Sequence, residues 1–343
     1  MYQLLRHGLF RLPAEAAHDL GLLGLDLAGS WLAQPPPPCP VSCLGLTFPN
    51  PVGLAAGLDK NGDHIDALGR LGFGFVEIGT ITPRPQPGNP KPRMFRLPRQ
   101  QAVINRLGFN NKGIDHLCRQ LRRSRWASDG GIVGINIGKN RDTAQHQASE
   151  DYLICLRKAW PLASYITVNI SSPNTSGLRD LQHGDSFAEL LTQLESERER
   201  MVARHQRDVP LLIKLAPDMT AAEMDAVAKR LNSAAIDGVI CANTTISRPA
   251  GIASVEHGNE TGGLSGAPLR PLADRCLHEF RQRLRTDLPI IGTGGICQGS
   301  DAAEKIRLGA SLVQFYTGLI YRGPALIHDA VTAILQLADA DQP

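Results

Sequence analysis

The chain lacks the cysteine patterns that mark metal sites and disulfide scaffolds. Its seven cysteines include no C-x-x-C pair, and their number is odd. Zinc and iron–sulfur sites need closely spaced thiolates, so both are excluded, as is a disulfide framework. A reducing, cytosolic setting is expected, and no metal site is predicted. The cysteines are Cys39, Cys43, Cys118, Cys155, Cys241, Cys276 and Cys297.

The sequence also lacks a long apolar run and a strong excess of one charge. No segment approaches the roughly 20 apolar residues that cross a bilayer. Arg11 and Glu15 interrupt the N-terminal segment where a signal peptide needs its apolar core. The formal net charge of +3 gives no reason to expect nucleic acid as a partner. With 343 residues, 42% of them hydrophobic, the chain can form one large α/β barrel or two ordinary domains.

What the chain does contain is eight short β-rich runs separated by helix-like segments. This alternation predicts parallel strands with helical crossovers, and eight units predict a closed (β/α)8 TIM barrel of the α/β class. The alternative is an open doubly wound sheet, but its G-x-G-x-x-G fingerprint fails at Cys297. The predicted strands are Val52–Ala56, Phe75–Thr80, Ile132–Ile137, Tyr165–Ile170, Leu211–Ala216, Gly238–Asn243, Pro289–Gly294 and Leu312–Tyr316. The predicted helices include Asp63–Leu71, Phe187–Arg204, Ala221–Leu231 and Ser300–Leu308.

Residues 1–34 differ from the rest and predict two short amphipathic helices broken at Pro13. Such a segment most often packs as a helical cap, and the segment alone favours that interpretation. The alternative is an interfacial anchor whose Arg6, His7 and Arg11 lie near lipid headgroups. A stiff linker at Pro35–Pro38 follows, and the barrel is expected to span residues 41–338. The apolar stripe of the second helix is Ala16, Ala17, Leu20, Leu23, Leu27 and Trp31.

Polar side chains gather where the predicted strands end. In a barrel all these ends meet at one face, where the active site lies. No strand end carries His, and Asp59 is the only carboxylate there, so metal-assisted hydrolysis and His-driven acid–base chemistry fit poorly. Together the polar side chains at the strand ends form a ring, which packing of the core does not require. Its members are Asn136, Asn169, Asn243, Lys60 and Lys214, with Asn105 in the insertion 105–111.

The fourth strand opens into Ser171-Ser172-Pro173-Asn174, which cannot continue it because Pro173 lacks a backbone donor. Taken alone, the two serines are better explained as residues that cap the next helix or stabilise the turn by hydrogen bonds. The repetition of polar strand ends elsewhere instead favours a chemical role. Gly294 and Gly295 after the seventh strand predict a phosphate cradle, and therefore a phosphate-bearing organic cofactor.

Ten motifs then resemble those of dihydroorotate dehydrogenase, over roughly residues 1–336. The N-terminal extension, with Ser172 rather than Cys at the centre of the fourth-strand loop, is similar to the quinone-linked, membrane-associated branch. Two rivals stay open: a barrel enzyme that uses Lys60 or Lys214 as a Schiff-base amine, and a non-catalytic peripheral membrane protein. The motifs are GLAAGLDKNG, EIGTITPRPQPGNPKPR, INRLGFNN, GINIGKN, VNISSPNTSGLR, IKLAP, ANTT, TGGLSG, IIGTGGI and GASLVQFYTGLIYRGP.

The resemblance implies oxidation of (S)-dihydroorotate to orotate in pyrimidine (UMP) biosynthesis, with Ser172 as the catalytic base. It implies FMN as the cofactor, held by Ala56, Gly57, Leu58, Asp59, Lys60, Thr80, Asn136, Asn169, Lys214, Ala242, Gly266, Gly295, Tyr316 and Thr317. It implies a substrate site made of Lys60, Asn105, Arg106, Leu107, Gly108, Phe109, Asn169, Asn174, Asn243 and Thr244. Ala242 departs from the pattern, because relatives often carry Thr there.

The same resemblance changes the interpretation of residues 1–34. It implies that the two helices form an apolar tunnel to the flavin, with His18 and Arg96 at the quinone head. The chain is then expected to be a peripheral protein on the cytoplasmic face of the cell inner membrane. Its implied partners are dihydroorotate and orotate, a membrane quinone and the membrane surface, with no nucleic acid and no obligatory protein partner.

Overall fold

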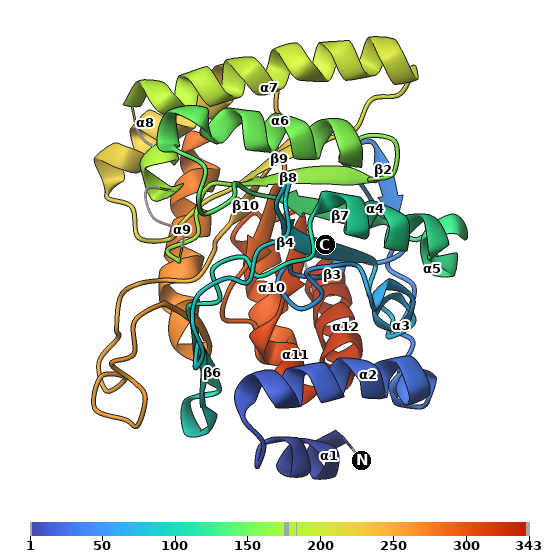
Figure 1. The fold of residues 1–343 in the computed structure, drawn as a ribbon. Helices are drawn as coiled ribbons and strands as arrows, with labels where there is room; N and C mark the ends of the chain where they lie inside the picture. The colour runs from blue at the N-terminus through green and yellow to red at the C-terminus, as the bar shows by residue number, and fades with distance from the viewer. Residues whose placement is uncertain (1, 175–177, 183, 341–343) are drawn as a thin grey trace.

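The computed structural model describes residues 2–174, 178–182 and 184–340, and its centre is a closed barrel of eight parallel strands (Figure 1). All eight predicted runs are barrel strands, so the predicted TIM barrel is confirmed. Most strands end one or two residues earlier than predicted. The strands are β3 (Val52–Leu54), β4 (Phe75–Ile81), β7 (Val133–Ile137), β8 (Tyr165–Asn169), β9 (Leu211–Lys214), β10 (Gly238–Cys241), β12 (Ile290–Thr293) and β13 (Leu312–Phe315).

Helices surround the barrel, as the alternating pattern predicts (Figure 1). The predicted helix 187–204 is α7, which buries Phe187, Leu190 and Leu194 against the barrel. The start of α8 is fixed by a capping box between Thr220 and Glu223. The helices are α3 (Ile65–Gly69), α4 (Ile114–Arg123), α5 (Arg125–Ser128), α6 (Ala148–Ala159), α7 (Gly184–His205), α8 (Ala221–Ser233), α9 (Arg270–Arg283), α10 (Gly299–Arg307), α11 (Thr317–Arg322) and α12 (Ala325–Ala340).

A hairpin of β1 (Val41–Cys43) and β2 (Leu46–Phe48) precedes the barrel and was not foreseen from the sequence. Its Phe48 is fully buried and meets Phe75 edge-on, with ring centroids 5.1 Å apart. Phe75 in turn packs edge-on against Tyr165. These rings form one apolar cluster with residues near the starts of the other strands. The hairpin therefore plugs the amino end of the barrel.

A second small sheet, also not foreseen, joins segments from two separate loops. It contains β5 (Met94–Leu97), β6 (Ala102–Asn105) and β11 (Gly263–Gly266), all antiparallel, in the order β11-β6-β5. The first two strands follow the carboxyl end of β4, and the third follows that of β10. The sheet thus belongs to the open, carboxyl face of the barrel, and it brings Asn105 to that face.

The N-terminal segment forms two helices, α1 (Tyr2–Leu9) and α2 (Ala14–Leu32), separated at Pro13 as predicted. They lie together at one side of the molecule, next to α11 and α3 (Figure 1). Residues facing the barrel include Ala17 and Leu22, which are buried. Within the described residues, no helix combines the length and the apolar character needed to cross a bilayer.

The prediction that the apolar stripe of this segment packs as a cap is wrong for most of the stripe. Leu27 and Trp31 are 82% and 83% exposed, and Leu20 and Leu23 about half exposed. The reason is that α2 buries Ala17 at the edge of the stripe together with Leu22, which lies outside the stripe. An exposed apolar face of this size marks an interaction surface rather than a packed cap.

Candidate functional site

A buried carboxylate that the sequence did not predict as a site residue lies inside the barrel. Glu77 on β4 is fully buried and accepts four hydrogen bonds. Asn136 Nδ2 donates to its Oε1 at 2.8 Å. Tyr165 Oη, Thr167 Oγ1 and Gln314 Nε2 donate to its Oε2 at 3.0, 3.2 and 2.9 Å. Burial and this carboxylate raise the pKa of Tyr165, so its hydroxyl stays a donor.

From Glu77 a directed chain of hydrogen bonds runs to the barrel mouth. Because Asn136 gives its Nδ2 to Glu77, its Oδ1 faces Thr80, whose Oγ1 donates to it at 2.5 Å. Thr80 Oγ1 accepts from Asn169 Nδ2 at 2.9 Å. The Oδ1 of Asn169 then accepts from the Ser171 hydroxyl and from Asn243 Nδ2, at 3.1 and 3.4 Å. Four predicted site residues, Thr80, Asn136, Asn169 and Asn243, are thus brought together with fixed amide orientations.

Ser172 lies in the loop that follows β8, and it is buried. Its Oγ accepts a hydrogen bond from the Asn174 backbone N–H at 3.2 Å. The Asn174 side chain donates to Asn105 Oδ1 at 3.3 Å, which joins this loop to the end of β6. At the end of β10, two strands away in the barrel, Thr244 N donates to Asn243 Oδ1 at 2.8 Å. The predicted base therefore sits among predicted substrate ligands, all at the carboxyl face.

The turn after β3 holds Ala56 to Lys60. Lys60 Nζ donates to the Gly57 carbonyl at 2.7 Å. Burial first, and then the nearby Arg93 cation, lower the pKa of Lys60 to about 8. Asp59 has a structural task instead, because its carboxylate accepts four backbone N–H bonds at 2.8–3.1 Å. Their donors are Asn61, Gly62, Asp63 and His64.

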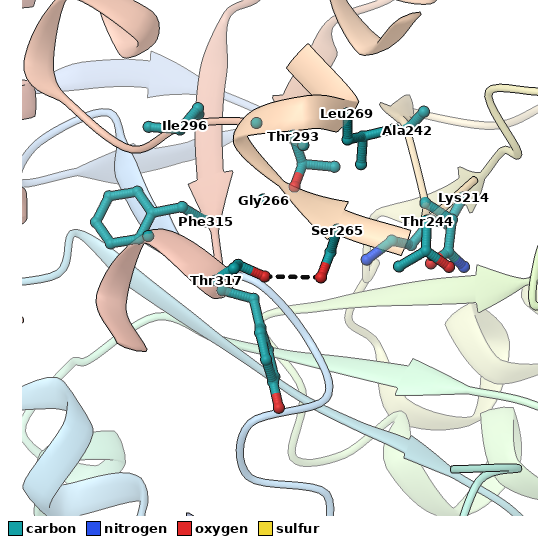
Figure 2. A pocket seen from close by; sticks show the side chains of 15 residues that line it. Lys214, Ala242, Thr244, Ser265, Gly266, Leu269, Thr293, Ile296, Phe315 and Thr317 are labelled. Carbon is teal, nitrogen blue, oxygen red and sulfur yellow. Dashed lines mark hydrogen bonds between the residues drawn. The ribbon is translucent and has the colours of Figure 1, made fainter. Parts of the chain in front are cut away.

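A cavity at the ends of β9, β10, β12 and β13 collects most of the other predicted cofactor ligands (Figure 2). In Figure 2 the side chains of Ser265 and Thr317 point toward each other, and their hydroxyls are 2.8 Å apart. Gly294 and Gly295 line it with φ of 94° and 82°, a conformation that favours glycine. Burial lowers the pKa of Lys214, and the Glu77 charge opposes that shift. The predicted residues in the wall are Lys214, Ala242, Asn243, Thr244, Gly266, Gly295, Tyr316 and Thr317.

The segment Asn105–Phe109 was predicted to bind substrate, and its side chains diverge. Arg106 points away from the strand-end network, because its Nη1 meets Glu260 Oε2 at 2.7 Å and its guanidinium stacks on Phe95. Leu107 and Phe109 are largely buried, while Gly108 has a positive φ of 71°. Any contact of Arg106 with a ligand at the network would therefore be made through its backbone.

A second, larger cavity of about 750 Å3 lies between α1, α2 and the barrel. Its walls are mainly apolar, and they include His18, Arg96 and Leu58, so the cavity reaches the turn after β3. Arg96 Nη1 donates to the Leu9 carbonyl at 3.3 Å and its guanidinium lies over the Phe10 ring. Burial first, then the charge of Lys60, lower the pKa of His18 to about 3, so its imidazole is neutral.

Sequence reasoning missed Glu77, Tyr165 and Gln314 because none of them lies at the carboxyl end of a strand: Glu77 and Gln314 lie inside strands, and Tyr165 begins one. One signal was available, since a glutamate within the apolar run Phe75–Ile81 is costly unless it has partners. The ion pair between Glu15 and Arg93 joins residues 78 positions apart, and no local sequence pattern indicates it.

The chain is similar to known proteins over nearly its whole length. The family model described as dihydroorotate dehydrogenase matches residues 39–337. A Marinobacter nauticus protein named dihydroorotate dehydrogenase (quinone) is 56% identical and covers 97% of this chain and 98% of its own length. One from Pseudomonas aeruginosa with the same name is 55% identical, covering 98% and 99%.

A solved structure supports the same assignment. The crystal structure of DHODH from Eimeria tenella in complex with ferulenol has a TM-score of 0.89 and 38% identity. It covers 98% of this chain and 95% of its own. The family model and the relatives agree with the fold, and the chain belongs to the dihydroorotate dehydrogenase family of oxidoreductases.

Proposed function

We propose that the protein oxidises (S)-dihydroorotate to orotate, with FMN as hydride acceptor and a membrane quinone as final electron acceptor, in the de novo synthesis of UMP. The observation that carries the proposal is the meeting of two unlike sites at one turn. Lys60, which we propose binds the substrate, follows β3 at the carboxyl face and donates to the Gly57 carbonyl, while Leu58, two residues earlier, lines the apolar cavity. A polar, anionic substrate and an apolar oxidant would thus reach one cofactor from different sides.

The residues present fit FMN. The Tyr316 hydroxyl is buried with no hydrogen-bond partner among the described residues, as expected of a group reserved for a ligand. Gly295 and Thr317 would hold the phosphate, and Lys214 would stabilise negative charge on the flavin ring. Asn136 and Asn169 would offer amides whose orientations are already fixed. Bound FMN supplies the hydride acceptor.

Ser172 would take the proton from the ring carbon next to the substrate carbonyl. A serine hydroxyl accepts that proton only as it gives up its own, so a relay must remove the second proton. The Asn174 N–H that donates to Ser172 Oγ would stabilise negative charge on this oxygen in the transition state. Lys60, Asn105 and Asn243 would bind the substrate carboxylate and ring amides.

The N-terminal helices would hold the protein on the cytoplasmic face of the inner membrane as a peripheral protein. Their exposed leucines and Trp31 would enter the lipid interface, and Arg6, His7 and Arg11 would meet anionic headgroups. The apolar cavity would admit the quinone, whose head would lie against His18 and Arg96.

The visible absorption spectrum of the purified protein tests this function. We expect a yellow protein that releases FMN, is bleached anaerobically by dihydroorotate, and regains its colour when quinone is added. A colourless protein trapped by borohydride with a carbonyl substrate would instead favour Schiff-base chemistry, for which the depressed pKa of Lys60 is suitable. Bound FAD, or FMN that dihydroorotate does not reduce, would refute the proposal.

A further inference from the structure

One buried guanidinium joins the N-terminal extension to the loops of the barrel mouth. Arg93 is only 7% exposed, and its Nε and Nη2 lie 3.0 and 2.9 Å from Oε1 of Glu15 in the first turn of α2. Glu15 is itself 17% exposed. A buried ion pair has strong consequences when it is broken, because the remaining charge is left without compensation. Lys91 also approaches Glu15, at 3.9 Å, but it is 66% exposed and contributes little.

The other edge of the same guanidinium fixes a tight loop. Arg93 Nη1 donates to the carbonyls of Pro87 and Asn89, at 2.5 and 2.9 Å. Gly88 between them has a φ of 76°, and a Cβ there would lie 2.2 Å from the Leu107 carbonyl. The loop 87–89 is therefore clamped between Arg93 and the segment that begins at Asn105.

This loop in turn supports two groups of proposed substrate ligands. Asn89 Nδ2 donates to the Arg106 carbonyl at 2.8 Å and to the Asn174 carbonyl at 3.4 Å. Asn89 N donates to the Leu107 carbonyl, and Arg106 N donates to the Arg93 carbonyl. A continuous set of contacts thus runs from Glu15 on α2 to the loops that carry Asn105 and Asn174.

Charge gives Glu15 a second effect on the same site. Burial and the Arg93 cation lower the pKa of Lys60, and the Glu15 carboxylate opposes that shift. Without Glu15, Lys60 would lose its proton at a lower pH and would bind an anion less well. The charged or titratable groups that act on Lys60 or respond to its charge are Arg93, Asp59, Glu15, Asp19 and His18.

We infer that Glu15, a residue of the N-terminal extension, is a positioning residue for the dihydroorotate site. It holds Arg93 and the loop 87–89 against the substrate loops, and among the described residues its hydrogen bonds and ion pairs are with Arg93 and Lys91 rather than with a proposed ligand. The inference rests on the proposed function and extends it. The extension then has a part in both half-reactions, because it forms the quinone cavity and also completes the substrate site.

The test measures orotate binding to the FMN-loaded, full-length protein, without turnover. The orotate Kd is obtained from the change in flavin absorbance for the wild type, Glu15→Gln, Glu15→Asp and Asp26→Asn. Asp26 is the matched control, because it is a carboxylate on the same helix that pairs with His64, at 2.7 Å, away from the loop 87–89. FMN content and the thermal midpoint are recorded first, and Glu15→Asp carries the test if Glu15→Gln loses its flavin.

We expect Glu15→Gln to raise the orotate Kd by about tenfold, since a small misplacement of binding groups is costly. Glu15→Asp should lose less, and Asp26→Asn should stay within about twofold. In Glu15→Gln, binding should also fail at a lower pH than in the wild type. A merely structural role would weaken quinone reoxidation and orotate binding alike, whereas here the quinone concentration at half-maximal rate should be unchanged.

An unchanged Kd in Glu15→Gln, or an equal loss in Asp26→Asn, would overturn the inference while the proposed function stands. If the wild-type flavoprotein gives no absorbance change with orotate, the proposed function fails, and the inference fails with it.

Discussion

Replacing Glu77 with glutamine should destabilise the barrel and loosen its hold on FMN. The glutamine carbonyl can keep the bonds from Tyr165, Thr167 and Gln314, but as neutral bonds rather than charge-assisted ones. The NH2 group of the glutamine then takes the place of Oε1 of Glu77, which accepts a hydrogen bond from Asn136 Nδ2 in the wild type. Two donors would face each other there. The Asn136 amide must then either rotate by half a turn or leave its NH2 group without an acceptor.

The size of this effect follows from the four hydrogen bonds. An unpaired buried donor costs about 1–3 kcal/mol, and weakening of three charged bonds adds about 1–2 kcal/mol, partly offset by the lower desolvation of a neutral group, for a total of about 3 kcal/mol. At about 2.1 cal/mol/K per residue, 343 residues give an unfolding entropy of about 0.7 kcal/mol/K, so the thermal midpoint should fall by about 4 °C.

The assay is thermal unfolding of the apo-protein together with release of fluorescent FMN from the holo-protein. Glu197→Gln is the matched control, since Glu197 is also a buried glutamate but pairs with Arg157 outside the barrel, at 2.9 and 3.0 Å. Both variants should unfold earlier, and only Glu77→Gln should release FMN more readily. A Glu77→Gln protein with a midpoint within 1 °C of the wild type and unchanged FMN affinity would refute the argument.

Four further expectations concern the two half-reactions and the membrane. Ser172→Ala should keep FMN but slow its reduction by dihydroorotate by about two to four decades in stopped-flow absorbance, and a wild-type rate would make Ser172 structural. Because the folded-state pKa of Lys60 is depressed to about 8, orotate affinity should fall as pH rises through that value; a flat profile to pH 10 would contradict this. Because the pKa of His18 is about 3, the rate of flavin reoxidation by quinone should not change between pH 5 and 7 through titration of this residue. A change of rate in that range that disappears in His18→Gln would contradict this expectation. Combining Leu27→Ser with Trp31→Ser should cut sedimentation with phosphatidylglycerol vesicles by more than about tenfold, with thermal stability unchanged, whereas undiminished binding would remove this face from the membrane contact.

The eight strands could be predicted because buried parallel strands read as continuous β-branched runs, such as Tyr165–Val168. Their polar ends could be predicted for the same reason, since the break in each run is visible. The sheet β11-β6-β5 could not, because it pairs Gly263 with Asn105 across a long stretch of chain. Local pattern carries no information about such a partner.

The expected role of the extension illustrates the same limit. From the sequence, every proposed ligand of dihydroorotate lies after residue 50, so deleting residues 1–34 should spare flavin reduction. The contact of Glu15 with Arg93 changes that expectation, because the deletion would leave a buried guanidinium without its carboxylate. An ion pair between distant segments is a property of the fold and not of either motif.

Because the hairpin β1–β2 covers the amino end of the barrel, solvent reaches the interior from the carboxyl end. Phe48, Phe75 and Tyr165 form an apolar layer at the amino end of the barrel, which disfavours passage of water or ions along the axis. A proton released inside the barrel would therefore not leave through that apolar layer. It would then leave by the carboxyl face, past the loops proposed to bind the substrate. Those loops would then control proton escape as well as substrate entry, and product release and deprotonation would use the same route.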